Sequence, residues 1–192
     1  MSKKTFVFST AIAVMMFLAS AAVRAASTAT LTLRVTVAPS PSVWIGATNY
    51  DFGNMPASAV SISQTSVAVI NNSEGLIEKY SIRASDAKND GNHSKPTDWT
   101  LAATAAADTY NLRAVFSATL PVDGDFDVVN DTLTTTATTC DGTKFATGAD
   151  GDGYGSIKGK EEHLWFRINT PTSVTDTNQH TIYITITAMG MD

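Results

Sequence analysis

The feature that most constrains the fold is a strict alternation of side-chain types in two runs near the end of the chain. In the run from 181 to 188, one side carries Ile182, Ile184, Ile186 and Ala188, and the other carries Thr181, Tyr183, Thr185 and Thr187. In the run from 161 to 169, Leu164, Phe166 and Ile168 lie opposite His163, Trp165 and Arg167. Successive side chains point to opposite faces of a strand, whereas a helix places neighbours three or four residues apart on one face. The two runs therefore predict half-buried β-strands joined by a polar turn.

Shorter runs of the same kind recur along the rest of the chain. The residues at 28–37, 43–45 and 109–116 alternate in this way, and the segments 60–70 and 76–84 predict a hairpin around Asn71-Asn72-Ser73. No segment longer than ten residues has helical periodicity. We therefore predict an all-β chain, a single Ig-like antiparallel β-sandwich of about eight or nine strands. Residues 121–160 are rich in Asp, Thr and Gly and form a long acidic insertion in it.

The amino terminus has the pattern of an export signal. Lys3 and Lys4 precede an apolar stretch from Phe6 to Leu18, and Val23-Arg24-Ala25 has the small-x-Ala form of a cleavage site. We expect residues 1–25 to be a bacterial-type signal peptide and residues 26–192 to be the mature sandwich domain. The apolar stretch is shorter than the roughly 20 residues that a membrane span requires. The expected location is secreted, extracellular or at the cell surface, with no membrane span in the mature chain.

Charge and cysteine content narrow the range of partners. Removing residues 1–25 leaves 10 basic against 18 acidic residues, so the formal net charge moves from −5 to −8. Such a surface disfavours nucleic acid and anionic membranes. Cys140 is the lone cysteine, and in an exported chain it is either shielded or bridged to another molecule.

One stretch has the spacing of a calcium loop. Counted over the twelve residues 150–161, the positions that supply ligands hold Asp150, Asp152, Tyr154, Ser156 and Glu161. Calcium prefers six or more oxygen ligands, and Gly155 stands where such loops turn sharply. Tyr154 departs from the usual Asp or Asn, and a flexible acidic loop without metal is the alternative. A second acidic string can add ligands if the two loops meet, and otherwise forms a solvated face: Asp123, Asp125, Asp127 and Asp131.

Residue patterns typical of catalysis are missing from the sequence. The three histidines stand in no His-Glu-x-x-His arrangement, and there is no Gly-x-Ser-x-Gly nucleophile motif. We therefore predict that the protein is not an enzyme. Aromatic side chains offer another use, since an exposed ring can stack on a sugar, although sandwich cores also bury such residues. The candidates for sugar stacking are Trp44, Trp99, Trp165 and Tyr183.

Two segments resemble known families. Tyr50–Met55 followed by Val67–Asn72 resembles the Phe-Gly…Val-x-Asn pattern of bacterial secreted Ig-like β-sandwich modules. Leu33–Pro39, followed by the same Asp-Phe-Gly, is similar to secreted pilins of the spore-coat-U type. The pilin pattern carries a cysteine pair, whereas this chain has only Cys140. Together the resemblances imply an exported Ig-like sandwich that works at the cell surface.

Two functions of different classes are consistent with these observations. The first is a non-enzymatic structural subunit of a filament, pilus or matrix that self-associates through its N-terminal strand, residues 28–37. Added to a neighbour's sheet edge, that strand would fill pockets with Leu31, Leu33, Val35 and Val37. Alternatively, the strand pairs within its own sandwich. The second function is a cell-surface adhesin or glycan-binding module stabilised by Ca²⁺.

Overall fold

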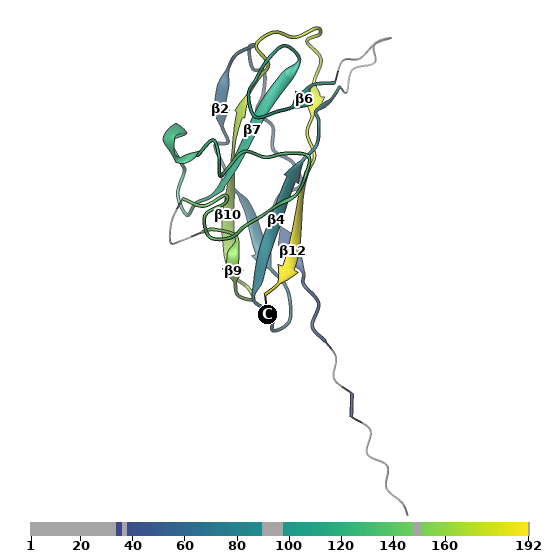
Figure 1. The fold of residues 1–192 in the computed structure, drawn as a ribbon, viewed down its shortest axis with the longest axis vertical. Helices are drawn as coiled ribbons and strands as arrows, with labels where there is room; N and C mark the ends of the chain where they lie inside the picture. The colour runs from purple at the N-terminus through teal and green to yellow at the C-terminus, as the bar shows by residue number, and fades with distance from the viewer. Residues whose placement is uncertain (1–33, 36–37, 90–97, 148–150, 192) are drawn as a thin grey trace, which may run out of the picture. The chain divides into compact units, whose positions relative to one another are not determined.

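The computed structural model describes residues 34–35, 38–89, 98–147 and 151–191 (Figure 1). The described chain is all-β, as the alternation predicts. Its strands are β1 (Val43–Ile45), β2 (Val60–Ile62), β3 (Val67–Asn71), β4 (Glu78–Ala84), β5 (Lys88–Asn89), β6 (Thr100–Leu101), β7 (Thr109–Phe116), β8 (Thr138–Thr139), β9 (Tyr154–Ser156), β10 (Glu161–Asn169), β11 (His180–Thr181) and β12 (Ile184–Gly190). A short 3-10 turn, η1 (Asp123–Asp125), follows β7.

The strands form two larger sheets and one small ribbon. The first sheet has the order β1-β3-β10-β7-β6, and β2 also pairs with β10. The second sheet has the order β12-β4-β8, and β9 also pairs with β4. β11 and β5 form the ribbon. Nearly all of these pairs are antiparallel, the exception being β6 with β7.

The two larger sheets enclose a single main core in a sandwich-like arrangement. β10 contributes Leu164, Phe166 and Ile168 to this core, all at most 7% exposed. β4 contributes Tyr80, Ile82 and Ala84 from the opposite sheet. The outward side chain of Trp165 instead joins a second cluster with Val115, Phe126 and Ile62. Both faces of β10 are thus covered, because part of the 121–160 segment lies over the outer face of its sheet.

The structure confirms several of the predicted strands. β7 spans the predicted residues 109–116 and places Tyr110, Leu112, Ala114 and Phe116 in the core. β10 spans 161–169 with the predicted face inward. The run at 181–188 is interrupted at residues 182–183, so that β11 pairs with β5 and β12 pairs with β4. The strand expected over 28–37 lies outside the described residues, apart from Arg34 and Val35.

The predicted hairpin between 60–70 and 76–84 is wrong. β3 pairs with β1 and β10, whereas β4 pairs with β12, β8 and β9, so the two strands belong to different sheets. The buried Asn71 explains the difference. Its side-chain oxygen accepts from Ser73 N, and its amide donates to Leu76 O and Ser156 O. These bonds stabilise the connection between β3 and β4, which crosses from the first sheet to the second.

Candidate functional site

β12 is an edge strand, and among the described residues no strand pairs with one side of its backbone. On β4, the N–H groups of Tyr80 and Ala84 donate to Gly153 O and Thr134 O, on the side away from β12. Antiparallel pairs alternate between hydrogen-bonded and non-bonded positions, so the residues of β12 opposite Tyr80 and Ala84 are in non-bonded positions. The N–H and C=O groups that point to the open side therefore belong to Ile184, Ile186 and Ala188. Unpaired groups of this kind make an edge strand a template for pairing with a further strand.

The side chains of the same three residues line an incompletely covered part of the core. They pack against the main core but are only half-buried. Directly opposite them on β4, the corresponding side chains are Tyr80 at 0%, Ile82 at 0% and Ala84 at 2% exposed. The core-facing side chains are thus fully covered on β4 and only partly covered on β12. Apolar surface left in water at a sheet edge is stabilised when another chain covers it.

β1 is the edge of the facing sheet and repeats this arrangement. Asn72 N donates to Ser42 O and Gly46 N donates to Ala68 O, both at 2.8 Å, which fixes the phase of the β1–β3 ladder. Val43 and Ile45 fall in the opposite phase, so their backbone groups point to the open side of β1. Both side chains are half-buried, and that of Val43 packs on the main core.

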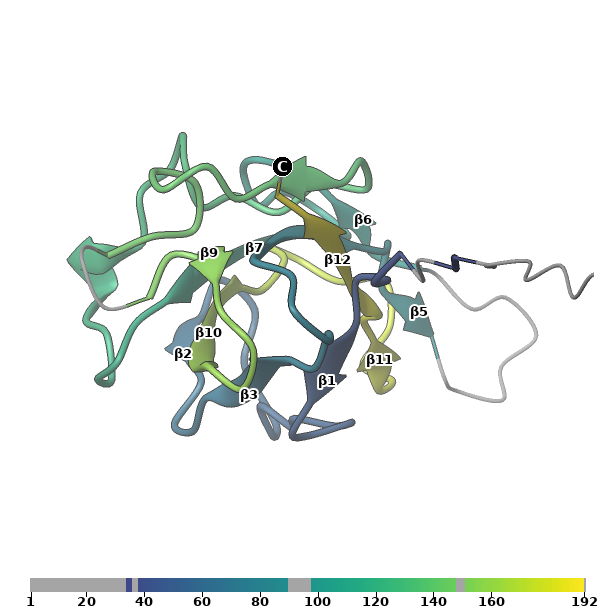
Figure 2. The same cartoon turned by 90° about the horizontal axis from the view of Figure 1, so that it is seen from below.

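The two open edges lie on the same side of the sandwich. Figure 2 shows β12 above β1, with β9 to the left of both. The edges come together where β12 ends, because a Cβ atom built on Gly190 would lie 3.8 Å from Pro41 Cγ. A strand placed between them would meet apolar side chains and free backbone groups from both sheets. We take the open edges of β1 and β12 as the candidate functional site and call them the acceptor edges.

A buried carboxylate fixes the start of β1. Glu78 is 0% exposed, and its Oε1 accepts the N–H of Ser42 at 2.7 Å. Its other carboxylate oxygen, Oε2, has no hydrogen-bond partner among the described residues. A buried carboxylate is costly unless hydrogen-bonded, so the contact with Ser42 constrains where residues 38–42 enter the sheet. Pro39 and Pro41 further restrict this linker, since proline fixes φ.

The residues of the predicted calcium loop take up different surroundings. Asp150 lies outside the described residues. Asp152 Oδ1 accepts Tyr154 N at 3.0 Å, and the buried Ser156 hydroxyl accepts from Tyr80 Oη at 3.2 Å. Glu161 lies on β10, 3.8 Å from His163 Nδ1. Within the described ranges no three His, Cys, Asp or Glu side chains are grouped to hold a metal ion. Calcium binding by this loop stays a prediction.

The second acidic string is engaged in local contacts. Asp123 pairs with Arg167, and this hydrogen bond lowers the pKa of Asp123. Two backbone N–H groups lower the pKa of Asp127 in the same way. Asp131 is 1% exposed, and burial raises its pKa to about 6. The pair of Asp123 with Arg167 ties η1 to the outer face of the first sheet, while Asp127 and Asp131 accept backbone N–H groups within the 121–131 segment. Asp125 caps the same segment by accepting Val122 N.

The four aromatic candidates divide into two classes. Trp165 is buried and donates its indole N–H to Ser117 O, and Trp99 stacks on His180 with ring centroids 3.9 Å apart. Trp44 is 52% exposed and Tyr183 is 60% exposed. Only Trp44 and Tyr183, of the four, are therefore more than half exposed.

Cys140 is a free and fully buried thiol. Burial raises its pKa, and the negative charge of Glu162 adds to the effect. A thiol of this kind is neutral and inaccessible, which confirms the shielded alternative and makes it a poor nucleophile.

Comparison with known proteins adds no further constraint. The chain matches no family model, no curated protein and no solved structure. Among the described residues, no helix has the length and apolar character needed to cross a membrane.

Sequence reasoning pointed to edge pairing but did not locate the acceptor edges. Alternation identifies β1 and β12 as strands and their inward faces, yet it says nothing of which neighbours they lack. The buried Glu78 was also missed, because an isolated Glu at the start of a strand is usually exposed. The one available sequence signal was the pair Pro39 and Pro41 before β1, because proline cannot donate a backbone hydrogen bond and so interrupts strand pairing there.

Proposed function

We propose that this protein is a non-enzymatic structural subunit of an extracellular filament, pilus or matrix. In this proposal an exported, Ig-like sandwich presents its acceptor edges to the N-terminal segment 28–37 of a neighbouring copy. The observation that carries it is the coincidence of free backbone groups and half-buried core side chains at Ile184, Ile186 and Ala188. A chain of such subunits grows head to tail, each supplying a strand to the next.

The N-terminal segment has the pattern that the acceptor edges require. Its apolar residues recur at every second position, which would place them all toward the open core. They are Ala29, Leu31, Leu33, Val35 and Val37. Within the described part of this segment, Val35 is 86% exposed, so its side chain has apolar surface left to bury. Burying one such Val or Leu is worth about 1.5–3 kcal/mol before ordering costs.

Length also supports the match. The segment has ten residues, more than the seven of β12, and as a strand it extends about 33 Å at roughly 3.3 Å per residue. The segment is therefore long enough to cover the whole open edge. Each backbone hydrogen bond adds about 0.5–1.5 kcal/mol, and pairing with both edges makes more of these bonds than pairing with either edge alone. A strand between β1 and β12 is for that reason the better arrangement.

The alternative is that the segment folds onto its own acceptor edges and leaves a monomer. The linker 38–42 would then have to reverse the chain within five residues, two of which are Pro39 and Pro41. Proline restricts its own φ and disfavours a helical conformation in the preceding residue, which favours an extended linker. An extended linker delivers the segment to another molecule.

Paired variants of the N-terminal segment test the proposal. Leu33→Asp places a charge on the apolar face, while Thr32→Asp places the same charge on the polar face one residue away. We expect the secreted L33D protein to be monomeric by light scattering after size exclusion, and T32D to assemble like the wild type. Electron microscopy of native surface material should show the wild type in polymers. Equal assembly of both variants, or dispersed wild-type monomers only, would contradict the proposal.

A further inference from the structure

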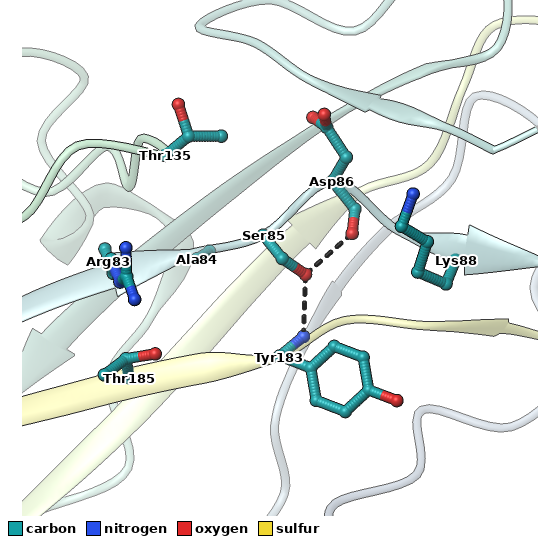
Figure 3. Close-up of a pocket in the computed structure, with 8 residues that line it drawn as sticks. All are labelled: Arg83, Ala84, Ser85, Asp86, Lys88, Thr135, Tyr183 and Thr185. Atoms are coloured by element: carbon teal, nitrogen blue, oxygen red, sulfur yellow. Dashed lines mark hydrogen bonds between the residues drawn. The ribbon is translucent and has the colours of Figure 1, made fainter.

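A polar groove lies on the outer face of the second sheet, apart from the core-facing residues of the acceptor edges. It has a volume of about 410 Å³ and is formed where β4 ends, where β12 begins and where the chain approaches β8. Figure 3 shows its lining arranged around Ser85, with Arg83 and Thr185 to one side and Lys88 to the other. Tyr183 lies below Ser85 in this view, and Thr135 and Asp86 lie above it.

The backbone of Tyr183 is fixed while its ring stays open. Tyr183 N donates to Ser85 Oγ at 3.0 Å, and Ser85 N donates to Tyr183 O at 2.9 Å. Ser85 Oγ in turn donates to Asp86 O at 2.6 Å. Tyr183 stands in the break between β11 and β12, where the alternation that would otherwise set its direction is interrupted. A ring 60% exposed on an anchored backbone offers a flat apolar surface with little conformational entropy to lose on binding.

The groove also carries opposite kinds of hydrogen-bonding groups: Figure 3 shows the Asp86 carboxylate above Ser85, Arg83 to one side and the Tyr183 ring below. Asp86 Oδ1 accepts Leu101 N at 2.9 Å, which anchors the carboxylate and leaves Oδ2 to accept another donor. The exposed Arg83 guanidinium has no hydrogen bond or ion pair within the described ranges, so its N–H groups are free to donate. Arg83 and Thr185 are direct partners in the β4–β12 ladder, so a hydroxyl stands beside the guanidinium.

We propose that this groove binds a neutral oligosaccharide. A pyranose ring has an apolar face that suits the Tyr183 ring, and hydroxyls that both donate and accept. Asp86 would accept from one hydroxyl and Arg83 would donate to another, while the ring face packs on Tyr183. The net charge of −5 and the Asp86 carboxylate disfavour a polyanionic glycan, and the second cation, Lys88, is already paired with Asp98.

The other exposed aromatic residue lacks these features and serves as a matched control. Trp44 is 52% exposed on β1, where a Cβ built on Gly46 would lie 3.1 Å from its Cζ3 atom. Its ring thus lies against the sheet over a glycine. Within the described residues, Trp44 lines neither this groove nor the second hollow beside Val60 and Thr170.

A glycan array followed by calorimetry tests the saccharide site. The secreted full chain is applied to an array of neutral oligosaccharides and of uronate oligosaccharides, and binders are titrated in solution. We expect a neutral oligosaccharide to bind at one site per chain. Tyr183→Ala and Asp86→Asn should each weaken it about tenfold or more, equivalent to about 1.4 kcal/mol, while Trp44→Ala leaves affinity unchanged. Far-ultraviolet circular dichroism checks that each variant is folded.

Three results would overturn the saccharide site. These are binding to none of the neutral oligosaccharides, binding to the uronate series alone, or affinity that survives Tyr183→Ala. The Tyr183 ring lies outside the core-facing set of β12, so assembly is measured separately on the same variants. Loss of glycan binding with intact assembly, or the reverse, distinguishes the two proposals.

Discussion

Two glycines in one short segment allow a sharp test of how the 151–156 region closes the core. Gly153 and Gly155 both have positive φ, +61° and +71°, so each favours glycine for the same backbone reason. They differ in space. A Cβ on Gly153 would lie 2.5 Å from Phe116 Cε2 and 2.7 Å from Cys140 Sγ, whereas a Cβ on Gly155 would meet nothing within 4 Å.

The substitution Gly153→Ala should therefore cost much more than Gly155→Ala. An alanine in the left-handed region costs about 1–2 kcal/mol at either site. Overpacking the core adds about 1–3 kcal/mol at position 153 alone. The total loss in the free energy of unfolding is then about 2–5 kcal/mol for G153A and about 1–2 kcal/mol for G155A. The larger figure is a substantial fraction of the 5–15 kcal/mol typical of a domain.

Urea unfolding of the secreted protein, followed by tryptophan fluorescence, measures both variants. Gly153 also donates its N–H to Glu162 Oε2 at 2.7 Å and accepts from Tyr80 N, so the segment cannot move away without losing two buried hydrogen bonds. We therefore expect the steric clash of the alanine Cβ atom at position 153 to lower the free energy of unfolding, because the backbone cannot shift to remove it. Equal losses at the two positions would show that Gly153 does not pack against Phe116 and Cys140, and the reasoning would fail.

Two further predictions concern carboxylates. Burial raises the pKa of Asp131 to about 6, above its ordinary value of 3.8. The folded state therefore holds this proton more tightly than the unfolded state. As a result, the protein loses stability as pH rises from about 4 to about 6. The stability of Asp131→Asn relative to the wild type, measured by urea unfolding, should therefore increase between pH 4 and pH 7; a difference that does not change with pH would contradict this. For the predicted calcium loop, 1 mM CaCl₂ should raise the melting temperature and a chelator should lower it, with Asp152→Asn removing the response, since extracellular sites bind at about 0.1–1 mM. An identical melt with calcium and with chelator rejects the metal.

Alternation alone was sufficient for the strands that are long and have one buried face. β7 and β10 appear where they were predicted and with the predicted residues inward, because a period of two leaves only one way to bury Leu164, Phe166 and Ile168 together. It failed at the connection after β3. There the local sequence Asn71-Asn72-Ser73 is suited to a tight turn, but the side chain of Asn71 bonds to Ser156, far along the chain. A contact of that kind is invisible to any local pattern.

The sequence by itself determined that this chain is all-β, which residues face inward on its main strands, and that its N-terminal segment has the same alternation as the strands of the folded domain. Only the tertiary structure decided which strands are neighbours, and so which edges stay open. The physical reason is that alternation reflects burial, a property of one strand, while an unpaired backbone group reflects the absence of a partner, which depends on the whole topology. The acceptor edges of β1 and β12, and the groove beside Tyr183, both arise from that topology.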